Sequence, residues 1–178
     1  MGAWNDLTTS FTETHVPLLA IGLRLATAVL LGLLIGWDRE RRSHAAGLRT
    51  MAIVSLGSAG FVLATIEIAY GLDRDEGLIE FDPARVIGGI VGGIGFLGAG
   101  AIIKSAGHVQ GLTTAAAIWA TAAVGLAAGA GLYPLALLLT AFALFILQTL
   151  RRAKGELLPD KRANPEAPAP TGHPNHAP

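Results

Sequence analysis

The spacing that most resembles a chemical site is the run Gly93-Ile-Gly-Phe-Leu-Gly98, which matches the dinucleotide-binding pattern GxGxxG. That pattern holds a pyrophosphate only where it follows a strand, opens a helix and precedes an acidic residue roughly 20 positions on. Here it lies inside the uncharged apolar stretch 86–103, and no acidic residue occurs between Asp82 and Glu156. The chain also has no cysteine, nucleophile elbow or HExxH zinc motif. We therefore expect a protein that is not an enzyme.

A second group of reactive side chains is the charged run Asp38-Arg-Glu-Arg-Arg42, followed by Arg49 and Thr50. Opposite charges this dense form ion pairs, and cations at a membrane surface also fix topology or hold anionic lipid. We expect Arg49 to pair with Asp38 or Glu40 and so to join two neighbouring helices. The candidate functional cluster consists of Asp38, Arg39, Glu40, Arg49 and Thr50.

Two further charges, Arg24 and Glu67, fall inside long apolar stretches. Counted from the ends of those stretches, they lie in the same half of a membrane, within about 6 Å in depth. Such charges pair, reach to the headgroups or contact an ion. We expect a structural Arg24–Glu67 pair, with an ion contact as the alternative.

Residues near the expected membrane surfaces complete the candidates for contacts within the membrane or to an ion. Two hydroxyls open one expected helix, where they would cap it or form hydrogen bonds across helices. A tryptophan eight residues from the start of the same stretch lies too deep for an interfacial belt. We expect it to pack internally or to offer its N–H to a site. These candidates are Asp82, Arg85, Thr113, Thr114 and Trp119.

The elements that must hold these residues are membrane helices. Of the 178 residues, 52% are hydrophobic and 15% charged, with 13 cationic and 13 acidic side chains. That balance excludes an electrostatic nucleic-acid binder, which needs a basic excess. A spanning helix needs about 20 apolar residues, and four nearly uncharged stretches qualify; the last holds two helices separated by a turn near 129–134. The stretches are 17–36, 48–70, 86–103 and 111–150.

The sequence thus predicts an all-α integral membrane protein, a bundle of five transmembrane helices. Lys and Arg gather in alternate loops and in the tail, which places the N-terminus outside and the C-terminus in the cytoplasm. We expect an extracytoplasmic segment at 1–16, a membrane domain at 17–150 and a tail at 151–178 that is basic and then proline-rich and disordered.

Glycines recur at four-residue spacing within the expected helices. Such pairs of small residues let helix backbones approach closely, which favours association in lipid. We expect packing within one chain; a homodimer seam, a face for another membrane protein and a broken helix lining an ion site are the alternatives. The helix-packing candidates are Gly32, Gly36, Gly88, Gly92, Gly93, Gly95, Gly98, Gly100, Gly125 and Gly129.

Taken in order, these segments resemble the MgtC/SapB family of bacterial membrane proteins. The resemblance rests on GLLIGWDRE at 32–40, AGLRT at 46–50, LGS at 56–58, DPARV at 82–86, GIGFLGAGA at 93–101, GLTTAA at 111–116 and Trp119. It covers the whole expected membrane region. Asp38, Gly89 and Gln110 depart from the family's usual Glu, Gln and basic residue.

The resemblance implies a non-enzymatic, multi-pass protein of the bacterial plasma (inner) membrane. Family members are linked to growth at low Mg²⁺ and, in pathogens, to survival inside host cells. The family's best-known member acts on the proton-translocating ATP synthase. Many members also carry a soluble C-terminal domain, which we expect this chain to lack, because the residues after Leu150 are mostly polar and rich in proline.

We therefore expect a regulator that binds another membrane complex, of the ATP synthase class, through its glycine faces and charged motif. A cation channel or transporter, for Mg²⁺, is the first alternative, and a structural or lipid-organising dimer is the second. We expect the lipid bilayer, and a membrane complex or second copy, as partners. No cofactor is expected, and Mg²⁺ is the ion that the transport alternative would bind.

Overall fold

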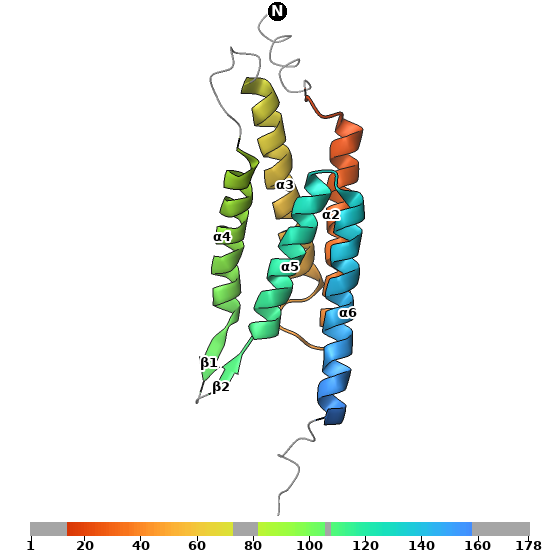
Figure 1. Ribbon diagram of the computed structural model, residues 1–178, viewed down its shortest axis with the longest axis vertical. Helices are drawn as coiled ribbons and strands as arrows, with labels where there is room; N and C mark the ends of the chain where they lie inside the picture. Colours follow the sequence, from red (N-terminus) through yellow and green to blue (C-terminus); the bar gives the residue numbers. More distant parts are fainter. Residues whose placement is uncertain (1–13, 73–81, 106–107, 158–178) are drawn as a thin grey trace, which may run out of the picture. The chain divides into compact units, whose positions relative to one another are not determined.

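The computed structural model describes residues 14–72, 82–105 and 108–157. Five helices dominate these ranges, and they run in alternating directions (Figure 1). They are α2 (Leu18–Glu40), α3 (Leu48–Leu72), α4 (Pro83–Ala101), α5 (Leu112–Gly129) and α6 (Tyr133–Leu157). The two expected segments at the chain ends lie outside the described residues, except for 14–16 and 151–157.

The helices match the expected membrane spans. Four of them, α2 to α5, are long and apolar enough to cross a bilayer. The apolar part of α6, Tyr133–Thr149, has 17 residues, which is the lower limit for spanning. The all-α membrane architecture is therefore confirmed, and the side on which each terminus lies stays a prediction.

Local sequence explains where the helices begin and end. Asp82 caps α4 by accepting a hydrogen bond from the Ala84 N–H at 2.9 Å, and Pro83 occupies the first helical position. The expected break in the last apolar stretch is confirmed at Gly131, whose φ of +79° suits glycine. Helix α2 continues to Glu40, beyond the expected apolar stretch 17–36. The charged run Asp38–Arg42 therefore begins in the last turn of this helix and not in a loop.

The core is formed by α2, α3 and α5, each of which packs against the other two. Gly32 and Gly36 bring α2 against α3: a Cβ added at Gly32 would lie 2.7 Å from the Met51 carbonyl oxygen. Gly125 and Gly129 do the same for α5, and a Cβ at Gly125 would overlap the backbone of Ser55. Packing within one chain is therefore the observed role of these two glycine pairs.

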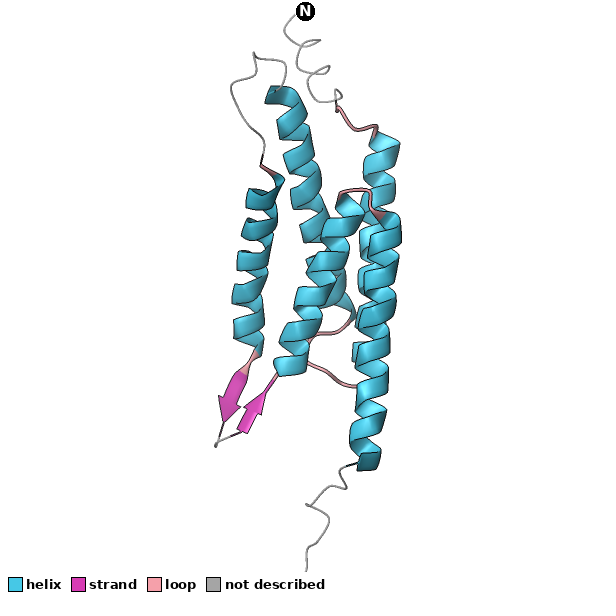
Figure 2. Ribbon diagram, in the orientation of Figure 1, coloured by secondary structure: helices cyan, strands magenta, loops and turns pink. Residues whose placement is uncertain are grey.

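A short antiparallel hairpin joins α4 to α5 (Figure 2). Strand β1 (Ile103–Ser105) pairs with β2 (His108–Gln110), with Ile103 opposite Gln110. The sequence predicts only a loop between the apolar stretches 86–103 and 111–150, because three-residue strands are too short to show alternation. Gly111 then turns the chain into α5 with a φ of +89°, and a Cβ there would overlap the Ala101 carbonyl.

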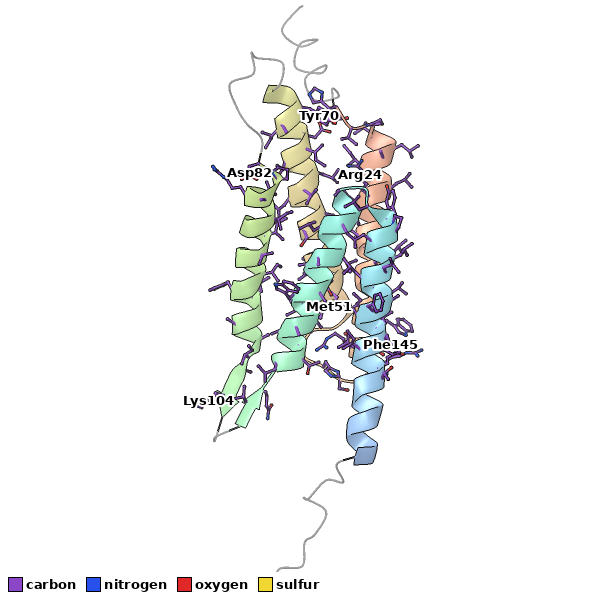
Figure 3. The ribbon with its side chains drawn as sticks, viewed as in Figure 1. Arg24, Met51, Tyr70, Asp82, Lys104 and Phe145 are labelled. Atoms are coloured by element: carbon purple, nitrogen blue, oxygen red, sulfur yellow. The ribbon has the colours of Figure 1, made fainter. Side chains whose placement is uncertain are left out.

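The described part of the chain divides into two compact units, with the boundary between Phe145 and Ile146. The core, the hairpin and every candidate site residue belong to the first unit. Its two ends are marked by Asp82 and Tyr70 at one end and Lys104 at the other (Figure 3). Below, these are called the Asp82 end and the Lys104 end.

Candidate functional site

The most buried charged side chain that the structure describes is Arg39, in the last turn of α2, with 1% of its surface exposed. Its Nε donates to the Ala46 carbonyl oxygen at 2.9 Å, and its Nη2 donates to Thr114 Oγ1 at 2.7 Å. A single guanidinium thus links the end of α2, the following loop and the first turn of α5. A hydrogen bond to a charged group stabilises by about 1.5–3 kcal/mol, so this group fixes three segments together.

Glu40 closes the loop that Arg39 supports. Its Oε2 accepts a hydrogen bond from the Leu48 N–H at 3.1 Å, at the first turn of α3. This carboxylate therefore satisfies a donor that the helix itself leaves free. Gly47 makes room for it, because a Cβ there would overlap the Glu40 carboxylate.

The expected ion pair between Arg49 and an acid of the motif is not found, and this prediction is wrong. Asp38 pairs instead with Arg42, one turn further along the chain, at 3.0 Å. Glu40 is engaged with the backbone, as described above, and both Arg49 and Thr50 are exposed. The i, i+4 spacing favoured Arg42, and Arg39 rather than Arg49 bridges the helices.

The expected Arg24–Glu67 pair is also wrong. Arg24 donates to the Gly129 carbonyl oxygen at 3.1 Å, where it satisfies the end of α5, and its guanidinium lies against Gly131. Glu67 accepts hydrogen bonds from the backbone N–H groups of His15 and Val16, both at 2.8 Å. Each charge therefore holds a backbone segment at the Asp82 end.

The candidates for ion contacts do not form one site. Asp82 caps α4 and Glu67 holds His15 and Val16, whereas Thr114 binds Arg39 at the start of α5, near the Lys104 end. Thr113 is exposed, and so is Arg85. Within the described ranges, no three His, Asp or Glu side chains are placed to hold a metal.

Trp119 does not pack internally, so that alternative is wrong, and a role for its N–H in a site stays a prediction. Its side chain is 55% exposed on α5. Thr114, which lies in the first turn of the same helix, forms the expected hydrogen bond across helices by accepting from Arg39.

The glycines of α4 differ from those of α2 and α5. Gly98 contacts Ala115 of α5, with 3.6 Å between its added Cβ and that of the alanine. Within the described residues, an added Cβ at the other glycines of α4 would meet nothing within 4 Å. Packing of these residues within the described chain is not seen, and their docking against another chain stays a prediction. They are Gly88, Gly89, Gly92, Gly93, Gly95 and Gly100.

Two contacts escaped the sequence analysis. The first is the burial of the Arg39 guanidinium, which its apolar neighbours Ile35 and Gly36 do not indicate. The i, i+3 spacing from Gly36 is the one signal that places Arg39 toward α3. The second is the hydrogen bond between Glu67 and the segment before α2, whose residue Val16 lies 51 positions away in the sequence. No local pattern encodes such a contact.

Comparison with known proteins agrees with this architecture. The MgtC family pattern matches residues 25–155. Protein SrpB of Synechococcus elongatus is 39% identical over 143 residues, which cover 75% of this chain and 76% of SrpB. Protein MgtC of Brucella abortus is 43% identical over 135 residues, covering 76% of this chain and 53% of that protein. Protein MgtC of Salmonella typhimurium is 40% identical over 131 residues, covering 74% and 52%.

The chain thus spans about half the length of these MgtC relatives and three quarters of SrpB. No solved structure matches it. The matched region contains the α4 glycines, most of α2, and the whole of α3 and α5. The chain is therefore a multi-pass membrane protein that belongs to the MgtC family.

Proposed function

We propose that this chain is a non-enzymatic regulator of the bacterial inner membrane, linked to Mg²⁺ homeostasis and growth at low Mg²⁺. It acts by binding another membrane complex, of the ATP synthase class. Family membership supports the link to Mg²⁺. The observation that carries the binding step is a row of small residues on α4 against which none of the described residues packs.

That face is a row of small residues along one side of α4. Gly88, Gly92, Gly95 and Ala99 follow one another at spacings of four, three and four, which aligns them on one face of a helix. All four are exposed. Among the described residues, no other part of the chain lies within 4 Å of a Cβ added at any of the three glycines. We call this row the small-residue face.

The small-residue face has the character of a helix-docking surface. The same four-residue spacing in α2 and α5 brings helix backbones into contact inside this chain. Close approach of backbones is what drives helix association in lipid, where burial of apolar surface adds little. A helix of a second membrane protein could therefore approach the backbone of α4 as closely as α3 approaches that of α5.

Exposed cations at the Lys104 end offer a second contact. Arg41 extends from the α2–α3 connection, Arg49 from the first turn of α3 and Lys104 from β1. The Arg41 guanidinium lies 4.8 Å from the ring centre of Trp37, which orders it by a cation–π contact. An acidic surface loop of the partner complex would complement this rim.

The test uses inverted membrane vesicles that contain ATP synthase, with and without this protein. ATP-driven proton pumping and ATP hydrolysis are measured side by side. We expect both activities to fall together with the wild-type protein. We expect Gly92→Leu, on the small-residue face, to remove that inhibition. The matched control is Gly22→Leu, an exposed glycine of α2 with nothing within 4 Å, which should inhibit as the wild type does.

The other outcomes contradict the proposal. A fall in pumping with unchanged or increased hydrolysis would mean that the protein conducts ions, as the transport alternative requires. Equal inhibition by the wild type and by Gly92→Leu would exclude the small-residue face as the docking surface.

A further inference from the structure

The opposite side of α4 borders a groove that the proposed regulatory contact does not use. The groove lies between α3 and α4 and has a volume of about 520 Å³. Its walls come from residues 53–65 of α3 and 86–97 of α4. At 100° per residue, Gly89 and Gly93 on the groove wall lie on the far side of α4 from Gly95.

Missing side chains create this groove. Gly57 of α3 and Gly89 and Gly93 of α4 all line it, and a Cβ added at any of them would meet nothing within 4 Å. The two helices consequently make far fewer contacts with each other than α3 makes with α2 or α5. A side chain could enter this space without displacing protein atoms.

The groove offers nothing for a polar ligand to bind. Its two hydroxyl groups are already used: Ser58 Oγ donates to the Val54 carbonyl at 2.9 Å, and Thr65 Oγ1 donates to the Phe61 carbonyl at 2.6 Å. All other lining side chains are aliphatic or aromatic, or are absent at glycine. Because both walls belong to membrane-spanning helices, the occupant must be apolar.

The length of the groove and the charge at its mouth indicate which apolar occupant fits. From Val86 to Leu97 the groove follows α4 for about 16 Å, close to half of a hydrocarbon core of about 30 Å. That length is the depth of one lipid leaflet. Arg85, immediately outside the groove at the Asp82 end, is exposed and forms no ion pair with any residue that the structure describes.

We propose that this groove is a phospholipid-binding site. One acyl chain lies along Gly89 and Gly93, and the headgroup phosphate meets the Arg85 guanidinium. Cationic side chains at the ends of membrane helices bind lipid phosphate in this way. This lipid site is separate from the proposed regulatory contact, because the groove lies on the side of α4 that faces α3, whereas the small-residue face lies on the other side of α4.

The experiment compares two leucine variants of α4. Gly93→Leu places a side chain in the groove, whereas Gly92→Leu places the same side chain on the small-residue face. Each protein is purified from membranes in mild detergent, and bound phospholipid is counted by native mass spectrometry. We expect the wild type and Gly92→Leu to retain one phospholipid per chain, and Gly93→Leu to retain several-fold less. Circular dichroism and thermal unfolding of each variant establish that it is folded.

Arg85→Gln tests the headgroup contact. Delipidated protein is reconstituted with a mixture of phosphatidylglycerol and phosphatidylethanolamine, and the lipid that remains after re-extraction is identified. We expect the wild type to be enriched in the anionic lipid and Arg85→Gln to lose that enrichment.

Three results would overturn the site. Equal phospholipid retention by Gly93→Leu and Gly92→Leu would show that lipid binds elsewhere. No retained phospholipid in the folded wild type would show that the groove has no affinity for it. Cross-linking of Gly93→Cys to a second Gly93→Cys chain in membranes would show that another copy fills the groove; the chain has no native cysteine to interfere. None of these results depends on inhibition of ATP synthase, so the lipid site and the regulatory role can fail separately.

Discussion

Gly125 and Gly129 in α5 and Gly88 and Gly92 in α4 share the same four-residue spacing, yet their surroundings are opposite. In α5, an added Cβ at Gly129 would lie 2.6 Å from the Ala59 carbonyl oxygen of α3. In α4, an added Cβ at Gly88 would meet none of the described parts of the chain within 4 Å.

The difference shows that one small-residue pattern can serve two purposes in a membrane protein. Where a partner helix of the same chain fills the space, the pattern builds the core. Where the space stays open among the described residues, as in α4, we propose that the helix keeps a surface for lipid or for another chain. Burial follows this division, since ten residues of α5 are buried but only Ile90 and Gly98 of α4.

The strongest test of this division is a large side chain at the core position. Gly125→Leu would drive its side chain into the α3 backbone at Ser55, and we expect a loss of about 3 kcal/mol or more in unfolding free energy. Size-exclusion profiles and thermal unfolding in detergent measure the effect. The matched control is Gly92→Leu in α4, which should fold with a melting temperature near that of the wild type. Similar destabilisation by both variants would contradict the division.

The second test concerns the buried guanidinium that holds the Lys104 end of the core. Arg39→Ala leaves the Ala46 carbonyl and the Thr114 hydroxyl without their donor, and we expect a loss of about 3 kcal/mol. Thr114→Val should cost about half as much, because Ala46 keeps its bond.

A double-mutant cycle on Arg39 and Thr114 measures their coupling directly. We expect a coupling of about 1–2 kcal/mol. Exposed Arg41 is the control, and Arg41→Ala should change the unfolding free energy by less than about 0.5 kcal/mol. Additive effects of Arg39→Ala and Thr114→Val would show that the 2.7 Å contact does not stabilise the fold.

A third, smaller effect is expected at the turn between α5 and α6. Gly131 has a φ of +79°, and Arg24 packs against it while binding the Gly129 carbonyl. Gly131→Ala forces a side chain into the left-handed region and against the guanidinium, so we expect a loss of about 1–2 kcal/mol. Thermal unfolding measures it. Gly22→Ala, in a helical and open position, should not destabilise the protein.

The helices were predictable from the sequence because their signal is local. Nearly uncharged stretches, a proline at the start of α4 and glycines near 131 each act within a few residues. The hairpin at Ile103–Gln110 was missed, since six paired residues carry too little periodicity.

The site was only partly predictable, because its partners are set by packing. The sequence placed Arg39 and Glu40 in a polar cluster, but it assigned the bridging role to Arg49. Which arginine is buried depends on how α2 rotates against α3, and that rotation follows from Gly32 and Gly36. The sequence placed Arg24 and Glu67 at a similar depth, but each instead binds a backbone group that is distant in the sequence.

The smallest expected effect has the opposite sign and comes from α4. Gly95→Ala adds a methyl group where nothing lies within 4 Å, and alanine favours a helix over glycine by up to about 1 kcal/mol. We therefore expect Gly95→Ala to stabilise the isolated chain slightly, as a rise in melting temperature in detergent. The same change at Gly129 should destabilise it, because the added methyl meets the backbone of Ala59. If Gly95→Ala also weakens inhibition of ATP synthase in vesicles, then α4 keeps glycine for docking at the expense of its own stability. If inhibition is unchanged, the small-residue face tolerates a methyl group, and docking depends on a more distant part of the surface.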